Sequence, residues 1–209
     1  MPSSLPGTYT LDSETLKLNA YRLLCLFYAN KEIARLSDPN DPDDAAVRLE
    51  KRFFSREMTQ LLLAIAIGLR VLDDQMRALP LENEHRKAYL ARREQVNRRH
   101  VCMMFDGMPL REVCNKIIHA IVVEPHSTEG SASHKIDEHN WLAWSEVHNV
   151  STEEAGPEPE PIKWEHLSGH IRLGGHHDKE QWWHLLEVPM FVEAVYELLD
   201  AGGHTNSIL

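Results

Sequence analysis

The chain has 209 residues, of which 43% are hydrophobic and 26% are charged, a composition typical of a globular protein with one domain. Its formal net charge of -10 argues against general electrostatic attraction to nucleic acid or to an anionic membrane. No apolar run reaches the ~20 residues that a membrane helix needs, and the N-terminus lacks the features of a secretory signal. The number of cysteines is odd. We therefore expect a cytoplasmic protein with reduced thiols.

Apolar residues that recur at three- and four-residue steps predict two long helices in the first half of the chain. The first begins after Asp12 or Ser13, either of which can cap the free N–H groups of a helix, and it ends before the two prolines of residues 38–44. The second begins at residue 43 or 44 and runs to residue 79, where Pro80 ends it.

Residues 82–100 are polar and rich in arginine, and they predict either a solvated helix or a helix followed by a loop. Their cations could contact the phosphates of RNA by charge alone, but Tyr89 is the only aromatic residue among them, so there is no stacking platform for single strands. A solvated helix face without a ligand explains the same pattern. The candidate RNA-binding residues of this segment are Arg92, Arg93, Arg98 and Arg99.

A short amphipathic helix is predicted over residues 110–120, with Pro109 in its first turn and Pro125 closing it. Its polar stripe consists of Arg111, Asn115 and His119. Because residues four apart are neighbours on a helix surface, Asn115 can orient His119. A histidine titrates near neutral pH, which suits it to proton transfer.

This helix resembles the motif helix of the HEPN superfamily (higher eukaryotes and prokaryotes nucleotide-binding), whose members often have the pattern R-N-x-x-x-H at this point. Asn115 and His119 match the pattern, whereas Cys114 stands in the place of the arginine and falls on the apolar face of the helix. The resemblance implies a HEPN-like helical bundle. For ribonuclease members it implies that the arginine and histidine of two protomers meet at a dimer interface. There they cleave RNA without a metal, by attack of the ribose 2′-hydroxyl on the adjacent phosphate.

The cysteine in the motif argues against that chemistry, since a thiol cannot hold a fixed positive charge against the transition state. Arg111, one turn earlier, and Arg70 of the second helix are alternative cations, although Arg111 is further from His119 than the family pattern has it. Asp73, beside Arg70, could instead orient His119. Asn115 and His119 could equally be structural residues that hydrogen-bond a neighbouring helix or loop.

The last third of the chain predicts a small antiparallel sheet. A strand is expected near residues 141–147, and a hairpin is expected around GGHHD (174–178), whose glycines permit the positive φ of a tight turn. The predicted organisation is one mainly helical domain, residues 1–209, with a HEPN-like bundle (13–125), a β-rich insertion (137–188) that contains an acidic loop (151–161), and a closing helix (189–201).

Histidines gather in the predicted hairpin, at His166, His170, His176, His177 and His184. If the turn centres on His177, His170 and His184 face each other across the strands, near enough to share a metal ion. No third ligand is fixed by the spacing, and no Cys-x-x-Cys or His-Glu-x-x-His motif accompanies them. We therefore expect no cofactor and no dedicated metal site.

The five tryptophans all fall in the β-rich segment, at Trp141, Trp144, Trp164, Trp182 and Trp183. Because each indole buries a large apolar area, they are expected to pack against the bundle or to line an interface with a partner, such as a homodimer.

Three functions follow from these patterns. The first is a cytoplasmic, HEPN-like protein without nuclease activity that binds RNA, a nucleotide or a protein partner. The second is a metal-independent ribonuclease of the toxin or phage-defence kind that uses His119. The third is a structural protein that assembles through its tryptophan-rich sheet. The sequence contains no DNA-binding motif and no glycine-rich phosphate loop.

Overall fold

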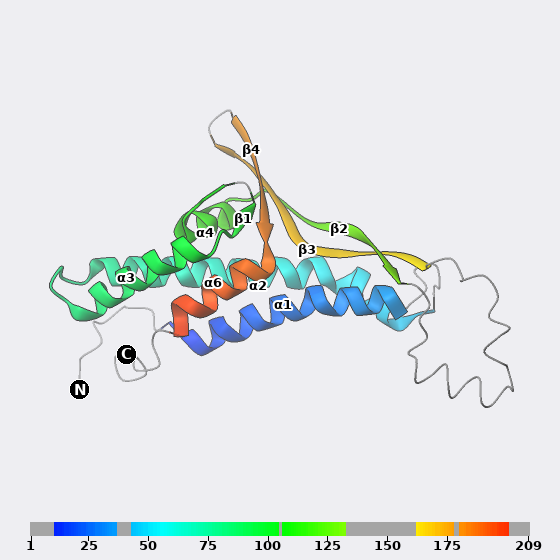
Figure 1. Ribbon diagram of the computed structural model, residues 1–209, viewed down its shortest axis with the longest axis horizontal. Coiled ribbons are helices and arrows are strands. Elements are labelled where there is room, and N and C mark those ends of the chain that lie inside the picture. The colour runs from blue at the N-terminus through cyan, green and yellow to red at the C-terminus, as the bar shows by residue number, and fades with distance from the viewer. Residues whose placement is uncertain (1–10, 37–42, 105, 133–161, 178–179, 201–209) are drawn as a thin grey trace, which may run out of the picture.

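The computed structural model describes residues 11–36, 43–104, 106–132, 162–177 and 180–200. The described chain is mainly helical and carries one four-stranded antiparallel sheet, which confirms the predicted fold class at this level. Figure 1 shows two long helices side by side, with the sheet rising from the bundle they help to form. No helix in the described ranges is both long and apolar enough to cross a membrane.

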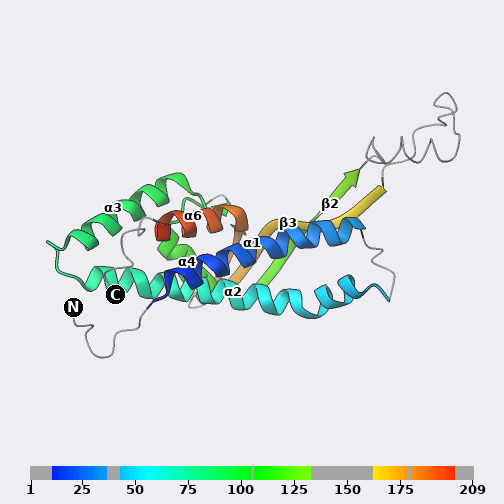
Figure 2. The same cartoon turned by 90° about the horizontal axis from the view of Figure 1, so that it is seen from below.

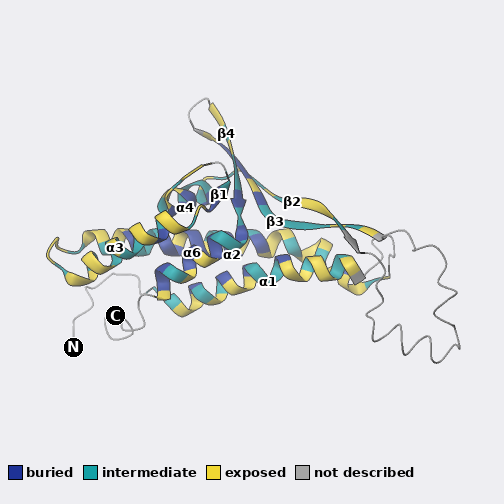
Figure 3. Cartoon of the chain, viewed as in Figure 1, coloured by how far each residue is buried: buried dark blue, intermediate teal, exposed yellow. Residues whose placement is uncertain are grey.

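The two long helices are α1 (Ser13–Leu36) and α2 (Ala45–Ala78), and they begin where the sequence predicts. The Asp12 carboxylate accepts a hydrogen bond of 3.0 Å from the N–H of Glu14, and Asp44 caps α2 in the same way. Seen from below, the helices run along each other for most of their length (Figure 2). Both helices carry buried residues, drawn dark blue in Figure 3, and these form much of the core.

Two shorter helices cover this pair. α3 (Glu84–Arg99) has one fully buried residue, Val96, and is the solvated helix that its composition predicts. α6 (Val188–Asp200) is strongly apolar, buries Phe191 and Val195 completely, and packs against α1 and α3. A polar contact joins the end of α3 to α6. Nε2 of His100, the residue after α3, lies 2.5 Å from the Glu197 carboxylate of α6.

The helix over the HEPN-like motif is shorter than predicted. α4 (Leu110–Ile118) ends before His119, and the chain then enters the strand β2 (Val122–Ala132), which was not predicted. Pro125 therefore does not close the helix; it lies inside β2, opposite Ile171. The position tolerates a residue without an N–H because β2 is an edge strand of the sheet.

The sheet has the strand order β1-β4-β3-β2. The strands β3 (Ile162–His177) and β4 (Glu180–Glu187) form the predicted hairpin, and β1 (Met103–Met104) extends it at the other edge. β2 begins before the predicted end of the helical part at residue 125. The strand expected near residues 141–147 and the acidic loop 151–161 lie outside the described residues.

Gly174 and Gly175 lie within β3, not in the turn where the sequence places them. A Cβ on Gly174 would overlap the Trp183 indole, and a Cβ on Gly175 would overlap Trp182. The glycines are therefore required because two adjacent tryptophans lie flat on β3, one on each face of the sheet.

Replacing these glycines should destabilise the fold unequally. Gly175→Ala should lower the free energy of unfolding by about 1–3 kcal/mol, since its methyl group would meet both Trp182 and, at 3.0 Å, the backbone oxygen of His119. Gly174→Ala should cost less, because Trp183 is 50% exposed and can move outward. Urea unfolding measures both. Gly107→Ala is the control, since nothing lies within 4 Å of its added Cβ.

Candidate functional site

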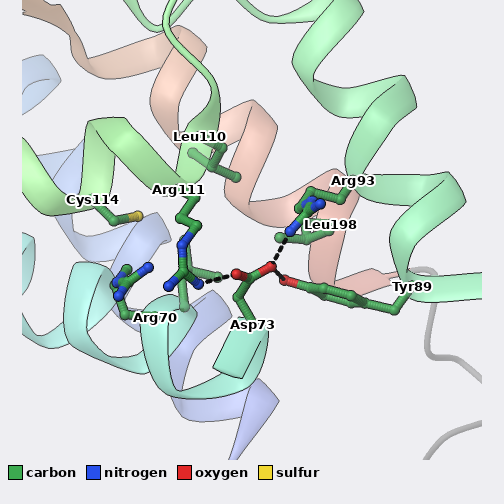
Figure 4. Close-up of a pocket in the computed structure, with 9 residues that line it drawn as sticks. Arg70, Asp73, Tyr89, Arg93, Leu110, Arg111, Cys114 and Leu198 are labelled. Atoms are coloured by element: carbon green, nitrogen blue, oxygen red, sulfur yellow. Dashed lines mark hydrogen bonds and ion pairs between the residues drawn. The ribbon is translucent and has the colours of Figure 1, made fainter. Parts of the chain in front are cut away.

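Asp73 on α2 is the only charged residue among the described ones that is buried, with 3% of its surface exposed. Three helices direct cations at its carboxylate: Arg77 of α2 at 3.0 Å, Arg93 of α3 at 2.5 Å, and Arg111 of α4 in a short ion pair. The Tyr89 hydroxyl of α3 donates a further hydrogen bond of 3.2 Å. Figure 4 shows Tyr89, Arg93 and Arg111 converging on Asp73.

A second carboxylate lies at the exposed side of the cluster. Asp74 pairs with Arg111 at 2.8 Å and, more loosely, with Arg70 at 3.7 Å. Four guanidinium groups thus share two carboxylates, which leaves an excess of positive charge. Nη1 of Arg70 is buried and has no hydrogen-bond partner among the described residues.

The first turn of α4 brings Arg111 to this place. Pro109 provides no side-chain cap, and the Asn97 side chain of α3 instead accepts a hydrogen bond of 2.9 Å from the N–H of Leu110. The apolar face of α4, with Val113 and Cys114 fully buried, holds the helix against the core. The start of α4 is therefore fixed to α3 by a polar contact and to the bundle by apolar packing.

These residues enclose a small cavity, which we call the arginine pocket. The space open to the centre of a water molecule is about 10 Å³, enough for about one water. The pocket is lined by Leu69, Arg70, Asp73, Tyr89, Arg93, Leu110, Arg111, Cys114 and Leu198.

The environment keeps Asp73, Cys114 and Tyr89 each in one protonation state near neutral pH. Burial alone would raise the pKa of Asp73, but the hydrogen bonds and charges of Arg93, Arg111 and Arg77 outweigh it and lower that pKa. Burial raises the pKa of the Cys114 thiol and of the Tyr89 hydroxyl. The pocket therefore holds a carboxylate, a neutral thiol and a neutral phenol, none of which is poised for proton transfer or nucleophilic attack near pH 7.

The predicted catalytic residues separate into two groups. Arg70 and Arg111 both line the arginine pocket, whereas Asn115 and His119 do not. Asn115 donates a hydrogen bond of 2.7 Å to Glu112, so the expectation that it orients His119 is wrong. His119 is exposed just beyond the end of α4, and the helical rise from Arg111 puts it roughly 12 Å away.

Each predicted RNA-binding arginine of α3 has a partner within the chain. Arg93 binds Asp73, and Arg98 pairs with Glu94. The other two donate to Glu197 of α6. Arg92 binds the backbone carbonyl oxygen of Glu197, and Arg99 binds the Glu197 carboxylate. Of the four, only Arg93 lines the arginine pocket. RNA binding by the exposed face of α3 stays a prediction.

The predicted pairing of His170 with His184 is wrong. The hairpin places Glu187 opposite His170, and it places Leu173 opposite His184, because the turn lies further along the chain than His177. His184 instead pairs with Asp106 at 2.7 Å. In the described ranges, no three His, Cys, Asp or Glu side chains gather closely enough to hold a metal ion.

The tryptophans that the structure describes lie along β3 and β4. Trp182 faces α4, where the Lys116 ammonium lies 4.4 Å from its ring, and Trp183 lies on the opposite face beside Arg172. Assembly through this surface stays a prediction, and Trp141 and Trp144 lie outside the described residues.

The centre of the cluster carries a signal in the sequence. Asp73 follows Leu69 by four residues, so it falls on the apolar face of α2, where a carboxylate needs cationic partners. Sequence reasoning named Asp73 only as a possible partner of His119. The contribution of Tyr89 has no comparable signal, since it depends on how α3 packs on α2.

No protein-family model, no curated protein and no solved structure matches this chain. The resemblance to HEPN proteins therefore stays a prediction that rests on the motif residues.

Removing the Asp73 charge should destabilise the protein in a pH-dependent way. Asp73→Asn should lower the free energy of unfolding by about 3 kcal/mol at pH 7, because it leaves Arg77 and Arg93 without their carboxylate partner and removes one of the two partners of Arg111. The pKa of Asp73 is lower in the folded chain, so its stabilisation is complete above about pH 4 and is lost as the pH falls through the folded-state value.

Denaturant unfolding at several pH values measures this effect. The difference between wild type and Asp73→Asn should stay constant from about pH 7 to pH 5 and shrink at lower pH. Asp74→Asn is the matched control, because the Asp74 side chain is 57% exposed and its removal should cost less than about 1 kcal/mol. If both variants lost the same free energy of unfolding, the burial of Asp73 would not make its carboxylate more important to stability than that of Asp74.

Proposed function

We propose that this chain is a non-catalytic, HEPN-like protein that binds a phosphate-bearing ligand, RNA or a nucleotide, at the arginine pocket. The observation that carries the proposal is the buried Nη1 of Arg70, a charged donor with no partner in the described part of the chain. A buried donor without an acceptor is unfavourable, and a phosphate oxygen at the pocket would satisfy it.

The charge balance of the pocket supports an anionic ligand. Arg70, Arg93 and Arg111 keep 21–25% of their side-chain surfaces exposed, so they can reach a ligand at the mouth while holding Asp73 and Asp74. A planar guanidinium donates two parallel hydrogen bonds to a phosphate. The protein as a whole is acidic, so attraction of this kind is local to the pocket.

The size of the pocket supports recognition of the phosphate alone. A space for about one water admits an oxygen atom and excludes a nucleobase. We therefore expect binding that depends little on base identity.

The separation of Arg111 from His119 argues against a ribonuclease site formed within one protomer. General acid–base cleavage needs a histidine and a cation at the same phosphate. Within this chain the cations pair with Asp73 or Asp74, and the His119 side chain is exposed beyond the end of α4.

Ligand binding should depend on Arg70. Arg70→Gln should weaken the binding of a fluorescein-labelled oligoribonucleotide by at least roughly tenfold, since a hydrogen bond to a charged group is worth about 1.5–3 kcal/mol. Fluorescence anisotropy measures the change, and ATP should compete, whereas adenosine, which lacks phosphate, should not. Losing one phosphate contact should also reduce the slope of the logarithm of the binding constant against the logarithm of salt concentration by about 0.7 in magnitude.

Arg98→Gln is the matched control, because it removes the same charge from the exposed face of α3. It should leave the affinity nearly unchanged. Equal weakening by both variants would mean that general charge attracts the ligand, and adenosine competing as well as ATP would contradict recognition of the phosphate.

The protein should not cleave RNA. In the presence of a metal chelator, RNA incubated with the wild-type chain should remain intact on a denaturing gel. Cleavage that His119→Ala abolishes, with the variant still folded, would reverse the proposal and establish the ribonuclease alternative.

A further inference from the structure

Two histidines and a serine meet on the sheet, and none of them lines the arginine pocket. His126 of β2 lies directly opposite His170 of β3. Nδ1 of His126 lies 3.2 Å from the Ser168 hydroxyl oxygen, and Nδ1 of His170 lies 3.0 Å from the same atom. Two imidazole nitrogens thus converge on a single point.

The backbone around this point is specialised. The pairing of β2 with β3 shifts register between His126 and Ser127, and Gly169 has a φ of +87°. Such bulges redirect side chains, and a residue with a Cβ rarely adopts this φ. The site is also tied to the bundle, because Asn30 of α1 accepts a hydrogen bond of 2.7 Å from the N–H of Leu167.

The hydrogen bonds define the state of both rings. The Ser168 hydroxyl donates its one proton to the carbonyl oxygen of His126, at 2.9 Å. Its oxygen can then only accept, so each imidazole faces it with an Nδ1–H. A metal ion bound to both Nδ1 atoms would replace these hydrogen bonds, with the proton of each ring carried on Nε2.

We propose that His126 and His170 bind a divalent transition-metal ion through their Nδ1 atoms, with the Ser168 hydroxyl oxygen as a third donor and water in the remaining positions. Imidazole is a preferred ligand of Zn²⁺, Ni²⁺ and Cu²⁺. The carboxylate of Glu187, opposite His170 on β4, adds favourable negative charge. The ion would connect β2 to β3 across the bulge.

This inference is independent of the proposed function, because it uses neither the arginine pocket nor its ligand. The site differs from a closed structural zinc site, which has four protein ligands. Its two imidazoles and one hydroxyl leave open positions, consistent with the lack of a three-residue His, Cys, Asp or Glu cluster in the described chain.

Equilibrium dialysis of the full chain against Zn²⁺ alone tests the proposal. The chain has 13 histidines, so the measurement is the difference between variants. His126→Ala and His170→Ala should each lose the same one equivalent of bound Zn²⁺, and the double variant should lose no more than either single one. Ser168→Ala should weaken this equivalent by roughly tenfold. His119→Ala, which removes an exposed histidine elsewhere, should retain it.

A spectroscopic measurement makes the test independent of stoichiometry. Electron paramagnetic resonance of the chain with one equivalent of Cu²⁺ should show two nitrogen ligands, and one of them should disappear in His170→Ala. Unchanged Zn²⁺ binding in both alanine variants would overturn the proposal. Separate, additive losses in the two variants would also overturn it, since they would mean two unrelated histidines.

Discussion

The helical part of this protein depends on one buried carboxylate. Asp73 lies on the apolar face of α2, where burial disfavours a charge, and it stays ionised because α3 and α4 each direct an arginine at it. Apolar packing alone would hold α3 weakly, since Val96 is its one fully buried residue among those described. The ion pairs to Asp73 and the contacts to Glu197 of α6 therefore determine where α3 lies.

The same interaction explains why the pocket suits binding better than chemistry. Arg111, which helps to hold Asp73 ionised, also acts on the thiol of Cys114 together with Arg70, but burial raises the pKa of that thiol and keeps it protonated. The pocket thus contains fixed charges, but neither Asp73 nor Cys114 nor Tyr89 changes its protonation state near neutral pH. An arrangement of fixed charges can attract and orient a phosphate, whereas cleaving one requires a proton to move.

Much of the fold was predictable because it depends on local rules. Asp12 and Asp44 cap their helices, and the apolar periodicity of α1 and α2 identifies the faces that form the core. The sequence predicted that a hairpin forms in this region, but it did not predict which residues of β3 and β4 pair with each other. Gly174 and Gly175 have the composition of a turn, and only the packing of two indoles shows that they belong to a strand.

The site was predictable in its parts. Arg70 and Arg111 are identifiable from helical spacing as cations near the motif helix, but spacing within one helix says nothing about which neighbour they face. Arg111 faces Asp73, whose position at the junction of three helices is a property of the tertiary fold, whereas Arg70 pairs with Asp74. The motif resemblance points instead to His119, which lies just beyond the end of α4 that is further from the cluster.

The position of His119 follows from the sheet. The N–H of His119 still donates to the carbonyl oxygen of Asn115 at 3.0 Å, as in a helix, but the N–H of Ile121 already donates to Gly174 of β3 at 2.8 Å. α4 must therefore end where β2 begins to pair, and His119 lies at the exit. Asn115 turns back to Glu112 and leaves the imidazole in solvent. Thus the N-x-x-x-H spacing persists in the sequence, although the helix that carries it ends just before its histidine.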